Sequence, residues 1–336
     1  MRYLLFFLLL LANPASALAR AFDCTGRDIL HTLPQATQQT ITQAAAETPY
    51  ATGLLWQAEK DGARITLFGT YHVPHASTQN HFDTLMPMAR TADVVFFEMS
   101  APDQAEFEKT AATDASLLFI TDGPTLPELL PEESWQELRR QMSERGMPSF
   151  MTAKFKPIYV SMLLGMSPCQ LRQQQAGQVG IDGRLSKALA SEGKDTRSIE
   201  DPMATLALFD NFTQAEQIAM IEMTLALPLS PDDLQETMYR LYADGETARL
   251  WEFGRALTIL YGGPTGAADF AKMEQALLTN RNRAWTAPLE AAARPGTSVF
   301  AAFGAGHLPG KDGVLNLLAQ NGWTITRLPL ARPSLD

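Results

Sequence analysis

The stretch Ile-Thr-Leu-Phe-Gly-Thr-Tyr-His at residues 65–72 has a counterpart near the other end of the chain, Ser-Val-Phe-Ala-Ala-Phe-Gly-Ala-Gly-His at residues 298–307. In both, an apolar run typical of a buried strand leads into a Gly-x-x-His motif. Only five histidines occur in the chain. Glycine permits a sharp backbone turn, and imidazole can hold a metal ion or move a proton near neutral pH. We therefore expect the two ends of the chain to build one core and one site.

A hairpin and a strand–helix–strand unit are predicted around the first motif. Residues 54–56 and 65–68 flank Asp61-Gly62, a dipeptide that favours the type I′ turn of a hairpin. A helical pattern follows, and then the apolar strand 94–97. This order is typical of a βαβ unit, so the strands at 65–68 and 94–97 should run parallel with a right-handed crossover.

The middle of the chain, from about residue 101 to residue 293, is mostly helical in pattern. Asp182 is expected to cap one of its helices, and residues 196–199 to form a short strand. Further helices are indicated at 131–146, 214–227, 231–242 and 269–292. The C-terminal part returns to strand, helix and strand, at 298–303, 312–320 and 323–327. The predicted fold class is α/β, a mixed sheet core formed from both ends of the chain with a large central helical insertion.

The N-terminus has the pattern of a secretory signal peptide at residues 1–19. Arg2 supplies the charge, residues 3–11 the apolar core, and Ala-Ser-Ala at 15–17 or Ala-Leu-Ala at 17–19 the cleavage site. The apolar stretch is too short for a comfortable membrane span. We therefore expect an exported protein without a transmembrane anchor, periplasmic or secreted, with one domain at 20–336.

The net charge excludes some classes of binding partner, and the two cysteines can be paired or free. The net charge is -10, and without a block of Lys and Arg this argues against nucleic acid and anionic membranes as partners. Cys24 and Cys169 are the only cysteines. In an oxidising compartment they could form a disulfide, or they could remain free thiols, because the sequence does not give their Cα separation.

Four potential ligands follow predicted strands, namely His72, Glu98, Glu200 and His307. The carboxyl ends of parallel strands meet at one edge of a sheet, where α/β proteins bind ligands. Two imidazoles and two carboxylates would suit a divalent zinc, manganese, iron or cobalt ion with an open position for water. Alternatively, one glutamate binds the metal and the other is the general base. The sequence does not distinguish these assignments.

Each of these residues also has a purely structural interpretation. A Gly-x-x-His motif can be an ordinary turn, Glu98 the first solvated residue after a strand, and Glu200 part of a polar turn. Arg281, on a predicted helix, either orients a substrate carboxylate or pairs with a core acid. His75 and His81 are expected on the surface, in the polar loop after the first motif.

Taken together, these motifs resemble the TraB/GumN family, which includes the Tiki proteases. The C-terminal block, Gly304 to Gly310, is the most specific. The resemblance spans about residues 50 to 328 and is carried by Leu67-Phe68-Gly69-Thr70-Tyr71-His72, Phe97-Glu98, Gly180-Ile181-Asp182, Glu200, Arg281-Asn282 and Phe303-Gly304-Ala305-Gly306-His307-Leu308-Pro309-Gly310.

The resemblance implies a superfamily shared with erythromycin esterases and haem-binding ChaN-like proteins. It implies a metal-dependent, peptidase-like hydrolase with a peptide or protein substrate and manganese, cobalt or zinc as the metal. The implied site residues are His72, Glu98, Glu200 and His307, supported by Arg281 and Asn282. Two alternatives stay open: a metal- or haem-binding protein without hydrolytic activity, with His72 or His307 as axial ligand, and a regulatory interaction protein.

Overall fold

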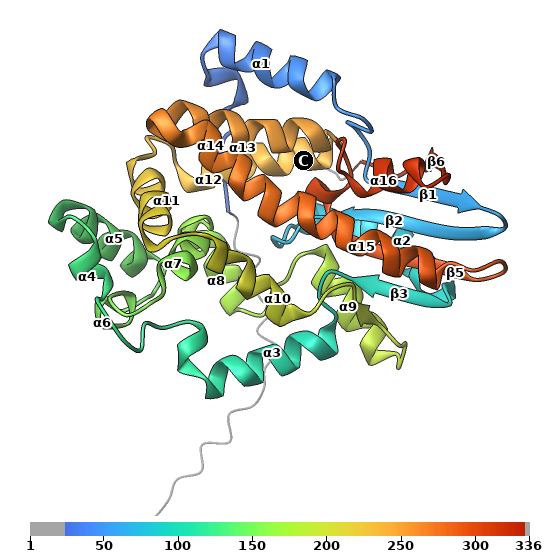
Figure 1. Cartoon of the computed structure of the whole chain (residues 1–336), viewed down its shortest axis with the longest axis horizontal. Helices are drawn as coiled ribbons and strands as arrows, with labels where there is room; N and C mark the ends of the chain where they lie inside the picture. Colours follow the sequence, from blue (N-terminus) through green and yellow to red (C-terminus); the bar gives the residue numbers. More distant parts are fainter. Residues whose placement is uncertain (1–23, 333–336) are drawn as a thin grey trace, which may run out of the picture.

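The structure is a computed structural model, and it describes residues 24–332 (Figure 1). Its centre is a six-stranded sheet in the order β4-β3-β5-β2-β1-β6. The strands are β1 Leu55–Lys60, β2 Ala63–Thr70, β3 Val94–Phe97, β4 Arg197–Ser198, β5 Ser298–Gly304 and β6 Thr324–Arg327. Strands β2 to β5 pair in parallel, whereas β1 is antiparallel to β2 and β6. The predicted α/β class with a mixed sheet built from both ends of the chain is confirmed.

Strand β5, from the C-terminal part of the chain, lies between β2 and β3 and is parallel to both. The parallel direction predicted for β2 and β3 is therefore confirmed, although the two strands are not neighbours. Thr70 pairs with Gly304 in the β2–β5 register, and Phe97 pairs with Ala302 in the β3–β5 register. As a result, both Gly-x-x-His motifs and Glu98 leave the sheet at the same edge.

The predicted hairpin is also confirmed. Strands β1 and β2 pair from Leu55↔Phe68 to Lys60↔Ala63. Asp61 and Gly62 between them have φ values of 50° and 78°, and two consecutive positive φ values are what the type I′ turn requires.

The helical insertion is confirmed between β3 and β5, and Figure 1 shows most of its helices to one side of the sheet. The helices before β4 are α1 Gln35–Ala46, α2 Gln79–Thr91, α3 Ala101–Thr113, α4 Leu126–Leu129, α5 Glu132–Glu144, α6 Ser149–Thr152, α7 Pro157–Leu164, α8 Pro168–Gln175 and α9 Ile181–Ser191. Those after it are α10 Pro202–Ala207, α11 Gln214–Ala226, α12 Pro231–Ala243, α13 Thr247–Tyr261, α14 Gly266–Glu274, α15 Asn280–Ala292 and α16 Val314–Gln320.

Two local predictions need adjustment. The helix predicted at 269–292 consists of α14, a π-helical turn at Gln275–Thr279 and α15. Asp182 does not cap its helix: the N-cap residue of α9 is Gly180, and Asp182 lies in the first helical turn. Its carboxylate is thereby free to bond a residue outside the helix.

Apolar side chains cover both faces of the sheet, and successive strand residues alternate between the faces. On one face Phe68, Phe97 and Phe300 pack against α2, α9 and α12. On the other, Leu67 and Phe303 pack against α15 and α16. The insertion has an apolar cluster of its own, formed by α4, α5, α7, α8 and α11. The boundaries predicted for a single domain, 20–336, stay a prediction.

His81 was predicted at the surface, and this is wrong. Its side chain is fully buried, lying edge-on to the rings of Phe68 and Tyr242. Its Nε2 donates a hydrogen bond of 2.9 Å to the carbonyl of Ala331. The C-terminal segment therefore covers the face of α2 that carries His81, although the polar sequence around His81 suggested that this face is exposed. His75, by contrast, is exposed as predicted.

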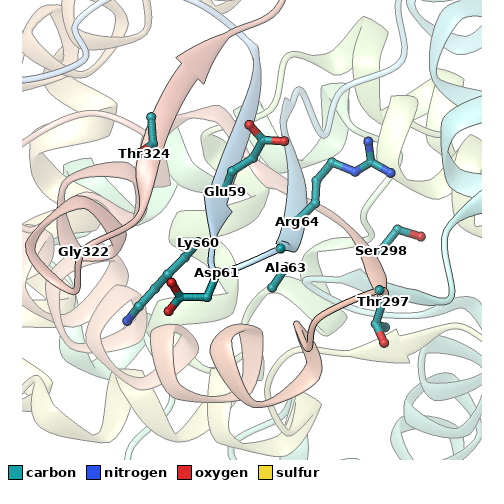
Figure 2. A pocket seen from close by; sticks show the side chains of 11 residues that line it. Glu59, Lys60, Asp61, Ala63, Arg64, Thr297, Ser298, Gly322 and Thr324 are labelled. Carbon is teal, nitrogen blue, oxygen red and sulfur yellow. The ribbon is translucent and has the colours of Figure 1, made fainter.

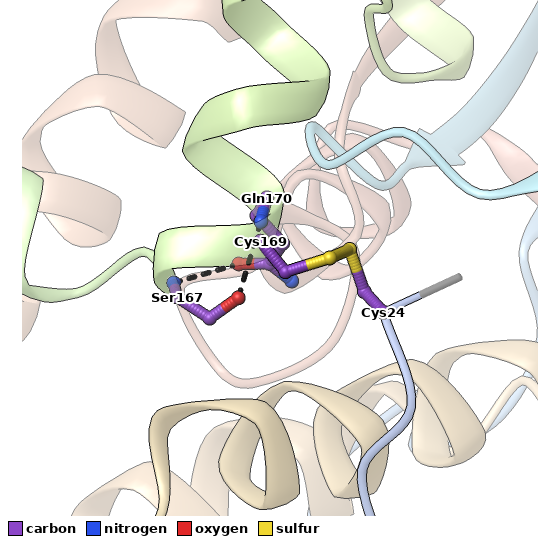
Figure 3. Close-up of a disulfide and its surroundings, with 4 residues drawn as sticks. All are labelled: Cys24, Ser167, Cys169 and Gln170. Carbon is purple, nitrogen blue, oxygen red and sulfur yellow. Dashed lines mark hydrogen bonds between the residues drawn. A yellow bond between two sulfur atoms is a disulfide. The ribbon is translucent and has the colours of Figure 1, made fainter. Parts of the chain in front are cut away.

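Cys24 and Cys169 form a disulfide with a Cα–Cα distance of 5.6 Å (Figure 3). It ties the N-terminal segment to α8, whose N-terminus is closed by a capping box between Ser167 and Gln170. The open question about the two thiols is thus answered by the disulfide. The predicted signal peptide lies outside the described residues. None of the helices within residues 24–332 is long and apolar enough to cross a membrane.

Candidate functional site

The six site residues predicted from the sequence lie together at the carboxyl edge of the parallel strands. His72 follows β2, Glu98 follows β3, and His307 ends a 3₁₀ turn directly after β5. Glu200 is the second residue after β4, and α15 supplies Arg281 and Asn282. Arg281 joins the group because it bonds Glu98, Glu200 and His307. The two ends of the chain therefore meet in one constellation.

His307 is a neutral imidazole whose Nε2 carries a lone pair. The amide nitrogen of Asn282 donates to the carbonyl of Asp312 at 2.9 Å, so its amide oxygen faces His307 Nδ1, 2.6 Å away. This oxygen can only accept, so Nδ1 carries the proton. Nε2 then accepts from Arg281 Nη1 at 3.3 Å. Burial, followed by the nearby charge of Arg281, lowers the pKa of His307 to about 3.

His72 is held by Asp182, a residue expected from the sequence only as a helix cap and as part of the family motif. The His72 Nδ1 lies 2.7 Å from Asp182 Oδ2, and its Nε2 lies 3.6 Å from Glu98 Oε2. Burial of the ring would lower its pKa, but Asp182 and then Glu98 outweigh that effect and raise the pKa to about 9. The side chain is still 54% exposed, so His72 is the member of the site most open to solvent.

Gly180 explains why Asp182 reaches His72. A Cβ at Gly180 would lie 2.4 Å from the backbone carbonyl carbon and oxygen of His72. Ile181 donates its backbone N–H to the carbonyl of Tyr71 at 3.3 Å. Helix α9 therefore begins in direct contact with the first Gly-x-x-His motif, and only glycine permits that approach. An acidic residue in the first turn of a helix that begins with this glycine was the available sequence signal.

Of the two roles considered for Arg281, the structure shows the ion pair with core acids. Its Nε lies 3.1 and 3.0 Å from the two oxygens of Glu200, and its Nη2 donates to both Glu98 and Glu200. Its side chain is 8% exposed. Burial would raise the pKa of the Glu98 carboxyl, but His72 and Arg281 are among the charges that outweigh it and hold that pKa far below its usual range.

Gly304 keeps a small space open between the imidazoles and Glu98. A Cβ at this position would lie 3.0 Å from His72 Nε2, 3.5 Å from His307 Cδ2 and 3.6 Å from Glu98 Oε2. The Gly304 N–H also donates to Glu98 Oε2 at 3.2 Å. The first glycine of the second motif therefore lies in close contact with both histidines and Glu98.

The donor groups suit a divalent metal ion in chemistry more than in arrangement. Within residues 24–332 no group of three or more His, Cys, Asp or Glu side chains is placed to hold a metal ion, and the two glutamates point at a cation, Arg281. However, both imidazoles direct Nε2 inward while Nδ1 is bonded to Asp182 or Asn282. A hydrogen bond that fixes the other ring nitrogen in this way is typical of metal-binding histidines.

Most of the chain matches the model of a known protein family. The family model of TraB/PrgY/gumN proteins matches residues 54–327. The chain belongs to the TraB/PrgY/gumN family. The matched span runs from the residue before β1 to the last residue of β6, so the family unit includes the whole sheet, the helical insertion and all six site residues.

Two curated relatives are metalloproteases by name. The chain is 25% identical over 316 residues to Metalloprotease TIKI2 of Danio rerio, which covers 80% of this chain and 59% of the relative. It is 22% identical over 321 residues to Metalloprotease TIKI1 of Homo sapiens, covering 83% of this chain and 62% of the relative. The chain thus spans about three fifths of the length of these relatives.

Proposed function

We propose that this protein is an exported, metal-dependent hydrolase that cleaves a peptide bond. The observation that carries the proposal is the convergence of two Gly-x-x-His motifs on Glu98, with both imidazoles anchored through Nδ1 and directed inward through Nε2. The names of the two relatives supply the reaction class.

His72 and His307 are the groups that would hold the metal ion in this proposal, which leaves Glu98 for proton transfer. When bound, a divalent ion polarises a scissile carbonyl and lowers the pKa of a water molecule. Glu200 is assigned a different task, because Arg281 and the indole of Trp285 bond its carboxylate oxygens. It holds Arg281 in place instead of serving as a ligand.

The chain's own groups would provide proton transfer and hold one another in place. Glu98 Oε1 is bonded to Arg281, whereas Oε2 borders the space beside Gly304. We assign Oε2 as the proton acceptor for the attacking water. Arg281 bonds both glutamates, His307 and the carbonyl of Leu277, so we assign it the task of holding Glu98 and His307 in place. Asp182 keeps His72 in the tautomer that leaves Nε2 unprotonated when the ring is neutral.

Export is supported by the disulfide between Cys24 and Cys169. Disulfides persist in oxidising compartments and are rare where thiols are kept reduced. The N-terminal sequence pattern and the disulfide therefore support the same location, periplasmic or secreted.

The test is a calorimetric titration of metal-stripped protein lacking residues 1–19 with manganese, cobalt and zinc. The wild type should bind one of them saturably, and His307→Ala should lose that binding. His75→Ala, an exposed histidine three residues after His72, is the matched control and should bind as the wild type does. A peptide library then tests hydrolysis with and without the metal. Equal metal binding by wild type and His307→Ala would exclude this site as the metal centre.

A further inference from the structure

The backbone before Glu200 is held in the sheet by few hydrogen bonds. Strand β4, which precedes it, contains two residues and lies at the edge of the sheet. Its register with β3 consists of Phe96↔Arg197 and Phe97↔Ser198, followed by a hydrogen bond from Ile199 N–H to the Phe97 carbonyl. A short edge strand fixes a following side chain poorly, so the orientation of the Glu200 carboxylate depends on the side chains that bond it.

Trp285 is one of those side chains, and it contacts three site residues at once. Its indole Nε1 donates to Glu200 Oε2 at 3.0 Å. Its ring centroid lies 4.3 Å from that of His307, with an interplanar angle of 37°. The Arg281 guanidinium carbon lies 4.8 Å from the ring centroid, a cation–π distance. The side chain is 1% exposed, so these contacts are made away from solvent.

The position of Trp285 on α15 explains the triple contact. It follows Arg281 by four residues, about one helical turn, so both side chains point to the same side of the helix. The helix packs on the sheet face that carries Phe303, whose ring centroid is 5.3 Å from that of Trp285. This packing fixes the indole, and the indole in turn presents a rigid N–H donor to an edge-strand carboxylate.

We propose that Trp285 is a positioning residue of the catalytic centre: its N–H fixes the Glu200 carboxylate, and Glu200 then holds Arg281 against Glu98 and His307. The inference rests on the proposed function for its kinetic consequence, but its structural part stands independently. Phenylalanine at this position would keep an aromatic ring beside His307 and Arg281 but could not donate.

The test compares Trp285→Phe with Trp323→Phe. Trp323 is the matched control because its indole also donates to a glutamate, Glu290, at 2.8 Å, and its side chain is also buried. We expect Trp285→Phe to lower kcat about tenfold or more, as for a lost hydrogen bond to a charged group, with KM within about twofold. Trp323→Phe should leave both constants unchanged.

Hydrogen exchange of the same variants separates positioning from a loss of stability. In Trp285→Phe the amides of residues 197–203 should exchange several-fold faster, while the other core strands keep their wild-type protection. In Trp323→Phe that segment should be unchanged. Wild-type exchange at 197–203 in Trp285→Phe would overturn the proposal, and so would accelerated exchange throughout the sheet.

Two further measurements test whether Trp285 acts through Glu200 and provide a substitute variant. In a Glu200→Ala background, which removes the acceptor of the indole N–H, Trp285→Phe should cause little additional loss of kcat if Trp285 acts through Glu200, and full additivity of the two losses would refute that route. If Trp285→Phe does not fold, β-(3-benzothienyl)alanine at position 285 retains the ring size and removes only the N–H, and the same outcomes apply. A wild type that cleaves no peptide would defeat the proposed function, whereas the exchange experiment would still decide the role of Trp285.

Discussion

Gly304→Ala should abolish activity while leaving the fold intact. The φ and ψ angles of Gly304 are -48° and 133°, so alanine causes no backbone strain here. The new methyl group would lie 3.0 Å from His72 Nε2 and within 3.6 Å of His307 and Glu98. Under the proposed function, it would therefore crowd the groups that act on the substrate.

The two expected magnitudes differ widely. Replacing glycine by alanine at a compatible φ stabilises a protein by about 0.4–1 kcal/mol through the unfolded chain. The 3.0 Å contact opposes this by a similar amount, because the half-exposed His72 ring can move away. The free energy of unfolding should thus change by less than about 1 kcal/mol, and Tm by only a few degrees. Activity should fall at least about 100-fold, as for an ångström-scale displacement of reacting groups.

Gly306→Ala is the control in the same turn. A Cβ there would find its nearest neighbour, Trp251 Cε3, at 3.5 Å, which is ordinary van der Waals contact. Peptide hydrolysis and thermal unfolding of both variants give the answer. If Gly304→Ala were as active as Gly306→Ala, the space beside Gly304 would not be the reaction site. Unfolding of Gly304→Ala alone would show that the glycine serves packing instead.

Three other perturbations probe the supports of the site and the fold. Asp182→Asn should destabilise the metal-free protein below pH 6.5, and the difference from wild type should vanish as pH rises through about 9, because Asp182 raises the His72 pKa in the folded state only; urea unfolding across this pH range measures it. His81→Phe should reduce the loss of stability on acidification, since burial lowers the His81 pKa and the unfolded chain takes up the proton first as pH falls below 6.5; urea unfolding at pH 5 and 7.5 tests this, and equal losses in both proteins would contradict it. Cys24→Ser opens a disulfide that closes a 145-residue separation and should cost about 2–4 kcal/mol; guanidinium unfolding with and without reductant checks it, because reduced wild type should match the variant.

The edge at which the site forms could be predicted because the sequence shows where each strand ends. Apolar runs stop at Gly69, Phe97 and Phe303, and a residue with metal-binding or acid–base chemistry follows each run. Parallel strands gather such residues at one edge. The hairpin and the placement of His72, Glu98 and His307 follow from these local signals.

Other features depend on contacts that hydrophobic periodicity does not encode. Periodicity identifies β5 as a strand but does not indicate that it lies between β2 and β3. The bond between Asp182 and His72 joins residues 110 positions apart, and α9 reaches His72 only through close packing at Gly180. His81 was misplaced because its burial is created by the segment around Ala331, which lies at the opposite end of the sequence.

The central position of β5 also sets when the sheet can be completed during synthesis. The strand at 298–304 is synthesised long after β2 and β3, yet these two strands are joined only through it. Non-local pairing of this kind is slow to form. A nascent chain that stops before residue 298 therefore lacks the middle of its sheet rather than its border, and it carries His72 and Glu98 on strands that nothing yet aligns. The candidate site therefore cannot assemble before β5 has joined the sheet.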